Sequence, residues 1–229
     1  MEKVSIIIPA YNEEGIIQKT VESYKLQQYP LLEIIVVVNN SNDKTYEIAE
    51  RYADKVLNLG AIGVSVARNE GAKVAAGSIL IFSDADSIIS PGGVEKIANV
   101  VREGMIGTIL GRGDVKGFKG RLFFFYKNTV HKLRIHKGII DGVFFCHKKI
   151  FLETGGFNPA KKITEFDDFI FRARKIGARY KLITNCYAIT SLRRYEEKGY
   201  LKMCIFWIKY KSLSLVGREG KIASDYFKR

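Results

Sequence analysis

The chain has few residues of the kinds that define disulfide-rich or zinc-binding proteins. Of its 229 residues only three are cysteine and three are histidine. These residues are Cys146, Cys186, Cys204, His131, His136 and His147. Neither set has the spacing of a metal site, and the cysteines suggest no disulfide framework. We therefore expect reduced, mostly buried thiols in a cytoplasmic protein, and histidines with packing or surface roles.

Long hydrophobic runs are also missing. No window reaches the roughly 18 to 20 apolar residues that a membrane-spanning helix needs. The first residues, "MEKVSIIIPAYNEE", contain an apolar run of only about five residues and lack the pattern of a secretory signal peptide. Proline- or serine-rich linkers, internal repeats and low-complexity tracts are absent. The sequence therefore predicts one domain, over residues 1–229, that is soluble or lies on a membrane surface.

Acidic residues are fewer than basic ones. The chain has 24 Asp and Glu against 37 Lys and Arg, a formal net charge of +13. Such an excess favours an anionic partner, which could be nucleic acid, a phosphorylated small molecule or an anionic membrane surface. No segment resembles a recognition helix or an aromatic platform for single strands. We therefore expect no nucleic-acid partner.

Short β-branched runs alternate with helical patterns over the first hundred residues. The predicted strands are Val4–Ile8, Glu33–Val38, Lys55–Leu59 and Ser78–Phe82. The predicted helices are Gly15–Gln27, Lys44–Ala53 and Val64–Ala76. The near-continuous apolar strands are typical of a sheet that is covered on both faces. This alternation predicts a parallel, doubly wound sheet, with an N-cap for the second helix within "SND" (Ser41–Asp43).

Ligands of such sheets bind beyond the carboxyl ends of the strands. Four segments are expected there: Pro9–Glu13, Asn39–Asp43, Gly60–Asn69 and Ser83–Ser87. The last, "SDADS", places Asp84 and Asp86 directly after a buried strand. Crowded carboxylates repel each other and lose hydration. A divalent metal shared with a phosphorylated ligand would compensate for that cost, whereas the alternative is an ordinary strand-end turn.

The second half is less regular and more aromatic. We expect a loop rich in glycine, a helix of mixed aromatic and basic residues, a strand leading into a helix, a sharp turn and a helix ended by glycine. In chain order these are Gly107–Gly120, Arg121–Lys137, Gly142–Phe151, Thr154–Phe157 and Asp167–Gly177. An amphipathic stretch, "YLKMCIFWIKYKSLSLV", begins the tail.

Six segments resemble, in this order, the conserved blocks of family 2 glycosyltransferases. They are "VSIIIPAYNEE", "EIIVVVNNSNDKT", "GVSVARNEGAKVAAGSILIFSDAD", "LETGGF", "EFDDFIFRARKIG" and "TSLRRYEEKGYL", and the resemblance covers roughly residues 3 to 200. It implies a GT-A fold, an α/β architecture whose doubly wound, mostly parallel central sheet has helices on both faces. Residues 1–105 would form a nucleotide-sugar-binding half, residues 106–198 an acceptor-binding half, and residues 199–229 an amphipathic basic-aromatic tail.

The resemblance also implies an activity and a site. The activity is inverting, metal-dependent transfer of a sugar from a nucleoside-diphosphate donor to a glycan or lipid-linked acceptor, at a hydroxyl or a lipid phosphate. The implied donor-binding residues are Pro9, Ala10, Tyr11, Glu13, Asn39, Gly63, Arg68, Asp84, Ala85, Asp86, Arg193 and Arg194. Asp84 and Asp86 would border the diphosphate, and Asp86 would bind Mn²⁺ or Mg²⁺, which prefer oxygen ligands.

Two positions depart from the family pattern. Val38 stands where the family usually has an aspartate that contacts the nucleotide base, and Asn39 and Asn40 follow it. Valine cannot hydrogen-bond a base, so a contact shifted to Asn39 is expected. Phe166 stands where the catalytic aspartate is expected, within Glu165-Phe166-Asp167-Asp168. Because phenylalanine accepts no proton, the expected base is Asp167, then Glu165, with Asp168 as a structural partner, or transfer is impaired.

Each of these assignments has a structural alternative. The acidic cluster could only cap its helix, Arg68 could be a surface residue, and Arg193 and Arg194 could form a solvated charge run instead of a lid over the diphosphate. The tail could pack on the domain or lie on an anionic membrane. Rival functions are a nucleotide-sugar- or glycan-binding protein without catalysis, and a sugar-phosphate nucleotidyltransferase. A nucleotidyltransferase would need a basic, glycine-rich loop after the first strand. The segment at that position here, "PAYNEE", is acidic, which disfavours this function.

Overall fold

The structure is a computed structural model that describes residues 1–60, 63–114, 118–133, 142–161 and 164–200, and residues 202, 203, 205, 206 and 209. The first half contains β1 (Val4–Ala10), α1 (Ile17–Lys25), β2 (Leu32–Asn39), α2 (Thr45–Tyr52), β3 (Lys55–Leu59), α3 (Val64–Val74) and β4 (Ile79–Ser83). All four strands and three helices predicted from the sequence are confirmed, with shifts only at their ends. The near-continuous apolar runs form strands because both faces of the sheet are covered.

The second half adds shorter and less regular elements. They are β5 (Ser87–Ile89), α4 (Gly93–Val100), β6 (Met105–Gly113), α5 (Phe118–Leu133), β7 (Val143–His147), α6 (Lys148–Thr154), α7 (Glu165–Lys175), β8 (Arg179–Thr190) and α8 (Arg193–Lys198). The predicted strand-into-helix unit is confirmed as β7 and α6. Gly155 and Gly156, with φ of 79° and 72°, make the predicted sharp turn, and Gly177, with φ of 92°, follows the end of α7.

Two local expectations are wrong. The N-cap of α2 is Lys44, outside "SND", and its side chain makes no capping bond; Asp43 Oδ1 instead accepts a hydrogen bond of 3.0 Å from the N–H of Thr45. Residues 107–113 of the expected glycine-rich loop belong to β6. A Cβ at Gly107 would lie 2.0 Å from the carbonyl oxygen of Lys181, so glycine here permits close strand pairing.

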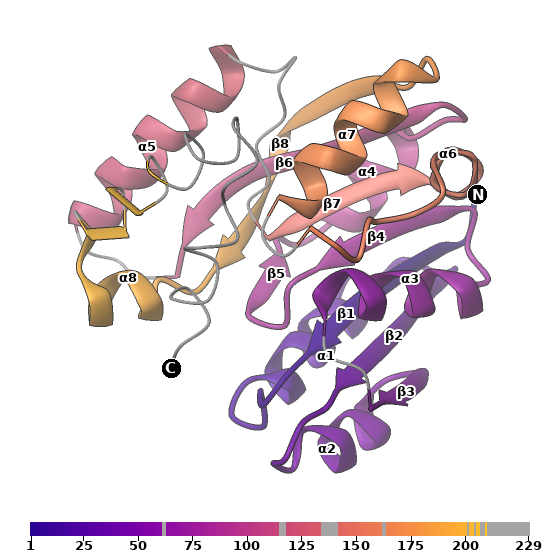
Figure 1. Ribbon diagram of the computed structural model, residues 1–229, viewed down its shortest axis with the longest axis horizontal. Helices are drawn as coiled ribbons and strands as arrows, with labels where there is room; N and C mark the ends of the chain where they lie inside the picture. Colours follow the sequence, from indigo (N-terminus) through magenta and orange to yellow (C-terminus); the bar gives the residue numbers. More distant parts are fainter. Residues whose placement is uncertain are drawn as a thin grey trace.

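The eight strands form one sheet in the order β3-β2-β1-β4-β7-β6-β8-β5. Strands β1 to β4 pair in parallel, whereas β7 is antiparallel to both β4 and β6, and β5 is antiparallel to β8. The β6–β8 pair is parallel, so four of the seven described pairings are parallel. Figure 1 shows the sheet running from β3 to the long strands β6 and β8.

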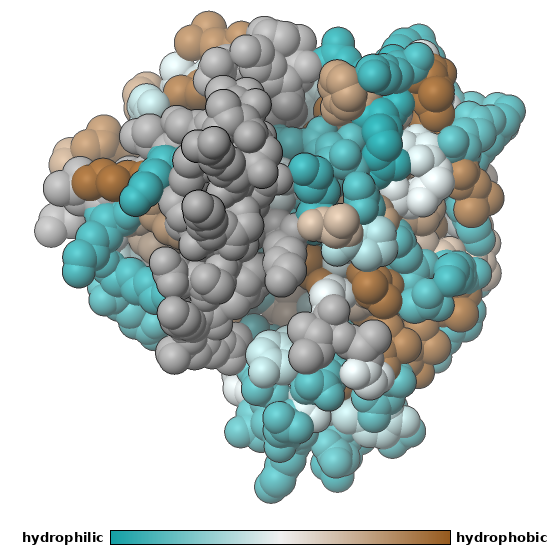
Figure 2. Space-filling model, in the orientation of Figure 1, coloured by the Kyte–Doolittle hydropathy of each residue, from teal (hydrophilic) through white to brown (hydrophobic). Residues whose placement is uncertain are grey.

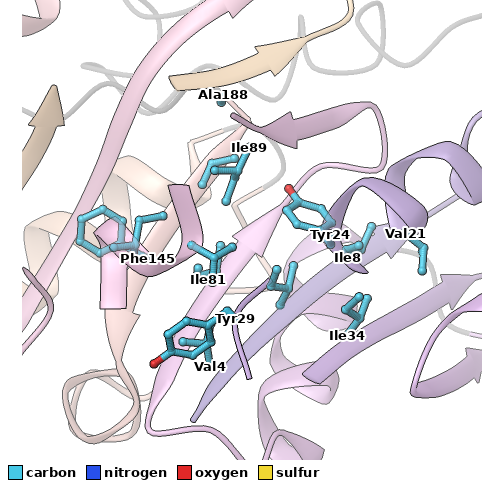
Figure 3. Close-up of a cluster of buried hydrophobic side chains, with 14 of the residues drawn as sticks. Val4, Ile8, Val21, Tyr24, Tyr29, Ile34, Ile81, Ile89, Phe145 and Ala188 are labelled. Carbon is cyan, nitrogen blue, oxygen red and sulfur yellow. The ribbon is translucent and has the colours of Figure 1, made fainter. Parts of the chain in front are cut away.

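Helices cover both faces of this sheet, as the sequence predicts. One buried cluster joins α1, α2 and α4 to the strands, and Tyr24 of α1 belongs to it together with Ile8 of β1 and Ile81 of β4 (Figure 3). The other cluster joins α3, α6 and α7 to the opposite face and is rich in phenylalanine. Within the described residues, no helix is long and apolar enough to cross a membrane.

Candidate active site

The loops that follow β1 and β2 are bonded to each other at the carboxyl edge of the sheet. The N–H of Asn12 donates to Ser41 Oγ (3.0 Å), and the N–H of Asn42 donates to Asn12 Oδ1 (2.9 Å). The N–H of Glu13 donates to Thr45 Oγ1 (2.8 Å). These bonds order a polar rim beside β4. Of the residues expected to bind the donor, Ala10 is buried, Pro9 and Glu13 are half-buried and Tyr11 is exposed.

The residues at the end of β2 are those expected to contact the nucleotide base. The side chain of Val38 belongs to the hydrophobic core, and Asn39, its neighbour, is also buried. The next residue, Asn40, is half-buried and adopts a left-handed conformation with φ of 58°. Asn40 is therefore the more accessible amide at this edge. Sequence reasoning did not single it out, although asparagine is a residue that tolerates positive φ.

A tight turn between β4 and β5 carries the two acids of "SDADS". The N–H of Ser87 donates to the carbonyl of Asp84 (3.0 Å), and the N–H of Asp84 donates to the carbonyl of Gly142 (2.9 Å). The side chain of Asp84 is 42% exposed, while Asp86 is half-buried and Ala85 is buried. Both carboxylates therefore lie at the surface end of a buried strand.

Buried hydroxyl groups hold this turn from below. Thr20 Oγ1 of α1 donates to the carbonyl of Ala85 (2.6 Å). One turn further along α1, the Tyr24 hydroxyl donates to the carbonyl of Ser87 (3.1 Å) and lies 2.6 Å from Ser83 Oγ. Burial raises the pKa of Tyr24 well above its ordinary value, so the phenol stays neutral. Sequence reasoning missed Thr20 and Tyr24, whose only signal was two hydroxyl groups on the apolar face of a helix.

Arg68 of α3 lies inside the protein, between two acids. Its side chain is only 3% exposed, and its terminal nitrogens donate to Asp84 Oδ1 (2.8 Å) and Glu165 Oε1 (2.7 Å). The guanidinium also lies over the ring of Phe166, 4.3 Å from its centroid. The alternative that Arg68 is a surface residue is wrong. The ion pairs connect the β4–β5 turn to the first turn of α7.

Glu165 is a buried acid whose hydrogen bonds are incomplete. Its Oε1 accepts from Arg68, whereas its Oε2 has no hydrogen-bond partner in the described structure. Burial raises the pKa of Glu165 above the ordinary range, although the charge of Arg68 acts in the opposite direction. A buried polar atom without a partner is uncommon and often marks a functional site.

The other members of the acidic cluster have different surroundings. Asp168 Oδ2 accepts from Nε and Nη2 of Arg172, both at 2.8 Å, and Arg172 also donates to the carbonyls of Thr154 and Gly156. Asp168 thus fixes the turn that precedes α7, as expected of a structural partner. Asp167 is half-buried. The N-cap residue of α7, Thr164, makes no side-chain bond to the helix, so the acids supply the negative charge at this helix end.

Phe166 is half-buried and packs on a cluster of aromatic rings. Its centroid lies 5.3 Å from that of Phe157 and 5.4 Å from that of Phe144. Asn69, next to Arg68, bonds both backbone groups of Phe157, at 2.8 and 2.9 Å. Sequence reasoning did not predict these two bonds, which hold the glycine turn against α3 and place Phe157 beside Arg68.

Three further residues of the expected site are Gly63, Arg193 and Arg194. Gly63 precedes α3 with φ of 147°, a conformation that favours glycine. Arg193 and Arg194 begin α8, but their side chains are not among those described. Most of the tail after residue 200 lies outside the described residues. Among the described residues, no three side chains of His, Cys, Asp or Glu lie close enough to hold a metal ion.

The fold is that of the GT-A glycosyltransferases, as comparison with solved structures shows. Residues of the Staphylococcus aureus protein TarS, crystallised as fragment 1-349 in complex with UDP-GlcNAc, superpose with a TM-score of 0.66, at 21% identity over 83% of this chain and 59% of that one. The mannosyltransferase PcManGT from Pyrobaculum calidifontis, in complex with GDP-Man and Mn²⁺, gives a TM-score of 0.65, at 20% identity over 81% of this chain and 56% of that one.

The chain belongs to glycosyl transferase family 2, whose sequence pattern matches residues 5–196. It is similar to glycosyltransferase GlyA of Streptococcus pneumoniae, at 24% identity over 95% of this chain and 32% of the relative. It is also similar to the uncharacterized glycosyltransferase YibD of Escherichia coli, at 37% identity over 44% of this chain and 31% of the relative. The chain spans about a third of the length of these relatives.

Proposed function

We propose that this chain transfers a sugar, with inversion and with the help of a divalent metal ion, from a nucleoside-diphosphate donor to an acceptor hydroxyl or lipid phosphate. The observation that carries the proposal is the position of Asp84 and Asp86. Both follow a buried strand of the parallel half-sheet, at the edge where ligands of such sheets bind. Family membership supports the same reaction.

The two carboxylates suit a Mn²⁺ or Mg²⁺ ion that also binds the donor. Asp84 gives one oxygen to Arg68 and remains 42% exposed, so its second oxygen can still bind a ligand. Mg²⁺ sites often use one or two carboxylates and complete their coordination with phosphate oxygens and water. When bound, the ion would stabilise the negative charge that develops on the leaving diphosphate. The Mn²⁺ in the PcManGT complex supports this assignment.

The donor would rest on the rim formed by the loops after β1 and β2. The rim residues Tyr11 and Asn40 are accessible enough to contact the nucleoside, and Asn40 replaces Asn39 as our candidate for the base contact. Arg68 would act indirectly, because its terminal nitrogens already bind Asp84 and Glu165. It would hold Asp84 in place and lessen the repulsion between the acids.

Asp167 is our candidate for the base. In the reaction the acceptor oxygen forms a bond to the anomeric carbon, the bond to the diphosphate oxygen breaks, and the acceptor proton passes to a carboxylate. Glu165 is buried against Arg68, and Asp168 binds Arg172, so both acids have structural roles; Asp167 lies between them in the sequence and is half-buried. Asp167 lies in the first turn of α7, the helix that packs beside the aromatic cluster.

A panel of UDP-, GDP-, TDP- and CDP-sugars, each with Mn²⁺ or chelator, tests the proposal by thermal shift. A ligand that binds the native state raises the unfolding midpoint. We expect one nucleotide to raise it in Mn²⁺, and Asp86→Ala to remove the metal-dependent part. Turnover of that donor should fall by about 10²- to 10³-fold in the same variant. Unchanged shifts and turnover in chelator would contradict a role for the metal.

Phe166 favours a second candidate, a nucleotide-sugar-binding protein without transfer activity. The ring lies over Arg68 and presents no proton acceptor where the family has an aspartate. This candidate predicts a metal-dependent thermal shift with no hydrolysis or transfer over a broad acceptor panel. If the wild type transfers a sugar to any acceptor and Asp167→Asn does not, the chain is an enzyme and this second candidate is wrong.

A further inference from the structure

Helix α5 has a buried side that fixes its orientation on the sheet. Asn128 of α5 bonds both backbone groups of Gly111 in β6, at 2.8 and 3.1 Å. Phe124 and His131 of the same helix are also buried. Positions 124, 128 and 131 share one face of a helix. The opposite face of α5 must therefore point away from the sheet.

That outer face is apolar and exposed. Large hydrophobic side chains on it are spaced by four, three, one and seven residues, so they form one stripe along the helix. The stripe consists of Phe118, Leu122, Phe125, Tyr126 and Leu133, which are 79%, 55%, 71%, 68% and 76% exposed. Figure 2 shows hydrophobic atoms along the edge of the molecule where Figure 1 places α5. Contiguous exposed apolar surface of this kind usually marks a binding face.

Basic residues border the stripe. Helix α5 contains no acidic residue, and Arg121 and Lys132 are exposed on it. Beside its first turns lies an open hollow of about 550 Å³, with Arg112 and Arg121 among its lining residues and Leu110, Phe125 and Ile189 supplying apolar surface. Among the described residues that line the hollow, the one acid is Asp114, which accepts a hydrogen bond from the N–H of Leu192 (2.9 Å).

We propose that the outer face of α5 binds an anionic lipid membrane surface. An interfacial helix buries its apolar side chains about 5–10 Å into the boundary between headgroups and acyl chains, while its cations contact anionic headgroups. A second copy of the chain fits less well, because a two-fold contact through this stripe would bring the cations of two α5 helices together. The proposal concerns attachment and does not depend on the transfer reaction.

Vesicle flotation with the full chain tests this proposal. The wild type is expected to float with vesicles of phosphatidylglycerol and phosphatidylcholine, to float weakly with phosphatidylcholine alone, and to be released by salt. The variant Leu122→Ser/Phe125→Ser/Tyr126→Ser should bind at least about tenfold more weakly, because three apolar side chains no longer leave water. The variant Arg121→Gln/Lys132→Gln should lose about 30-fold on anionic vesicles, since each cation near such a surface contributes about 1 kcal/mol.

A matched variant controls for the general loss of exposed hydrophobic residues. Leu26, Leu152 and Phe171 are 77%, 62% and 60% exposed on other helices or their ends, so Leu26→Ser/Leu152→Ser/Phe171→Ser should float like the wild type. Equal unfolding midpoints of the three proteins would show that the changes leave the fold intact. The proposal would be overturned if the wild type did not float with anionic vesicles, or if both serine variants lost vesicle binding to the same extent.

Two further outcomes would also overturn it. If the α5 triple variant dissociates a dimer in sedimentation velocity while vesicles bind neither protein, the stripe is an interface between copies. If it lowers the unfolding midpoint strongly and the wild type does not float, the chain covers the stripe itself. Failure of the nucleotide-sugar panel alone leaves this inference standing, because flotation requires no donor.

Discussion

Two glutamates buried at opposite ends of the same sheet differ in how fully they are bonded. Glu33, near the start of β2, receives hydrogen bonds from Ser5 Oγ (2.5 Å), the N–H of Ala76 (2.9 Å) and Lys55 Nζ (2.7 Å). Burial tends to raise the pKa of Glu33, but these bonds outweigh it and lower the pKa. Glu165, beside the carboxyl end of β4, has one bonded oxygen and a raised pKa.

This difference separates a structural acid from one at a site. At the amino ends of the strands every oxygen of the buried acid has a partner, so the region contributes stability. At the carboxyl ends one acid is incompletely bonded and two others are partly exposed, a state that costs free energy in the absence of a ligand. Changes at the carboxyl ends should therefore affect turnover or metal response, in some variants together with stability, whereas changes at the amino ends should affect stability alone.

The largest expected effect is on turnover in Asp167→Asn. Removal of the proposed base should lower the transfer rate by about 10²- to 10⁴-fold. The donor-induced thermal shift should remain, because the asparagine occupies the same volume. Asp54→Asn, at the amino ends where Asp54 Oδ2 accepts from the N–H of Ile34 (2.8 Å), is the control and should keep full turnover. Full activity of Asp167→Asn with loss in Glu165→Gln would move the role to Glu165.

The next effect is on stability in Arg68→Met. Loss of the guanidinium leaves the buried carboxylate of Glu165 without its ion-pair partner, which should lower the free energy of unfolding by about 3–5 kcal/mol. Denaturant titration measures this change. The double variant Arg68→Met/Glu165→Gln removes both charges and should recover a large part of the loss. If the double variant is as unstable as Arg68→Met, the ion pair is not the cause.

A smaller loss of stability is expected for Glu33→Gln. The amide cannot accept from Ser5, Ala76 and Lys55 together as a carboxylate does, so the free energy of unfolding should fall by about 1–3 kcal/mol. Turnover below the unfolding midpoint should not change. Glu103→Gln, which breaks an exposed pair with Lys149 (2.9 Å), should stay within about 0.5 kcal/mol of the wild type. Equal losses in the two variants would remove the contrast between buried and exposed acids.

The smallest effect is in the pH dependence of stability, which should have opposite signs for the two glutamates. The pKa of Glu33 is lowered from the ordinary 4.5, so its contribution is present above pH 4.5 and is lost as the pH falls through the folded-state value. The pKa of Glu165 is raised from 4.5, so its contribution is present below pH 4.5 and is lost as the pH rises through the folded-state value.

Unfolding curves between pH 3 and 8 for the wild type, Glu33→Gln and Glu165→Gln measure these contributions. The difference in the free energy of unfolding between the wild type and Glu33→Gln should grow as the pH rises. The corresponding difference between the wild type and Glu165→Gln should shrink as the pH rises. Parallel curves for the two variants would contradict the assignment of opposite shifts.

The parallel half of the fold could be predicted from the sequence because its signal is local. Each of its strands is a short run of apolar residues between turns, and the acids of "SDADS" follow such a run directly. The second half depends on pairings between distant segments. Strand β7 lies between β4 and β6, and β8 pairs with β5 across about a hundred residues. No periodicity in the sequence encodes that order.

The site was predictable by region but not by contact. Arg68, Asp84 and Glu165 were all selected from the sequence, yet nothing there showed that one buried arginine binds both acids. The position of Phe166 over that arginine is a property of packing. Thr20 and Tyr24 bond to the turn from 65 and 63 residues away in the sequence, contacts that only the fold creates.

The central claim is that Asp84 and Asp86 bind the donor diphosphate through a metal ion. Calorimetric titration of the nucleoside diphosphate selected by the thermal-shift panel tests it most directly, with Mn²⁺ and with chelator, for the wild type and Asp86→Asn. We predict tight binding only for the wild type in Mn²⁺, and weak binding for the variant in either condition. Equal affinity of the wild type and Asp86→Asn in Mn²⁺, or of the wild type with and without the ion, would contradict the claim.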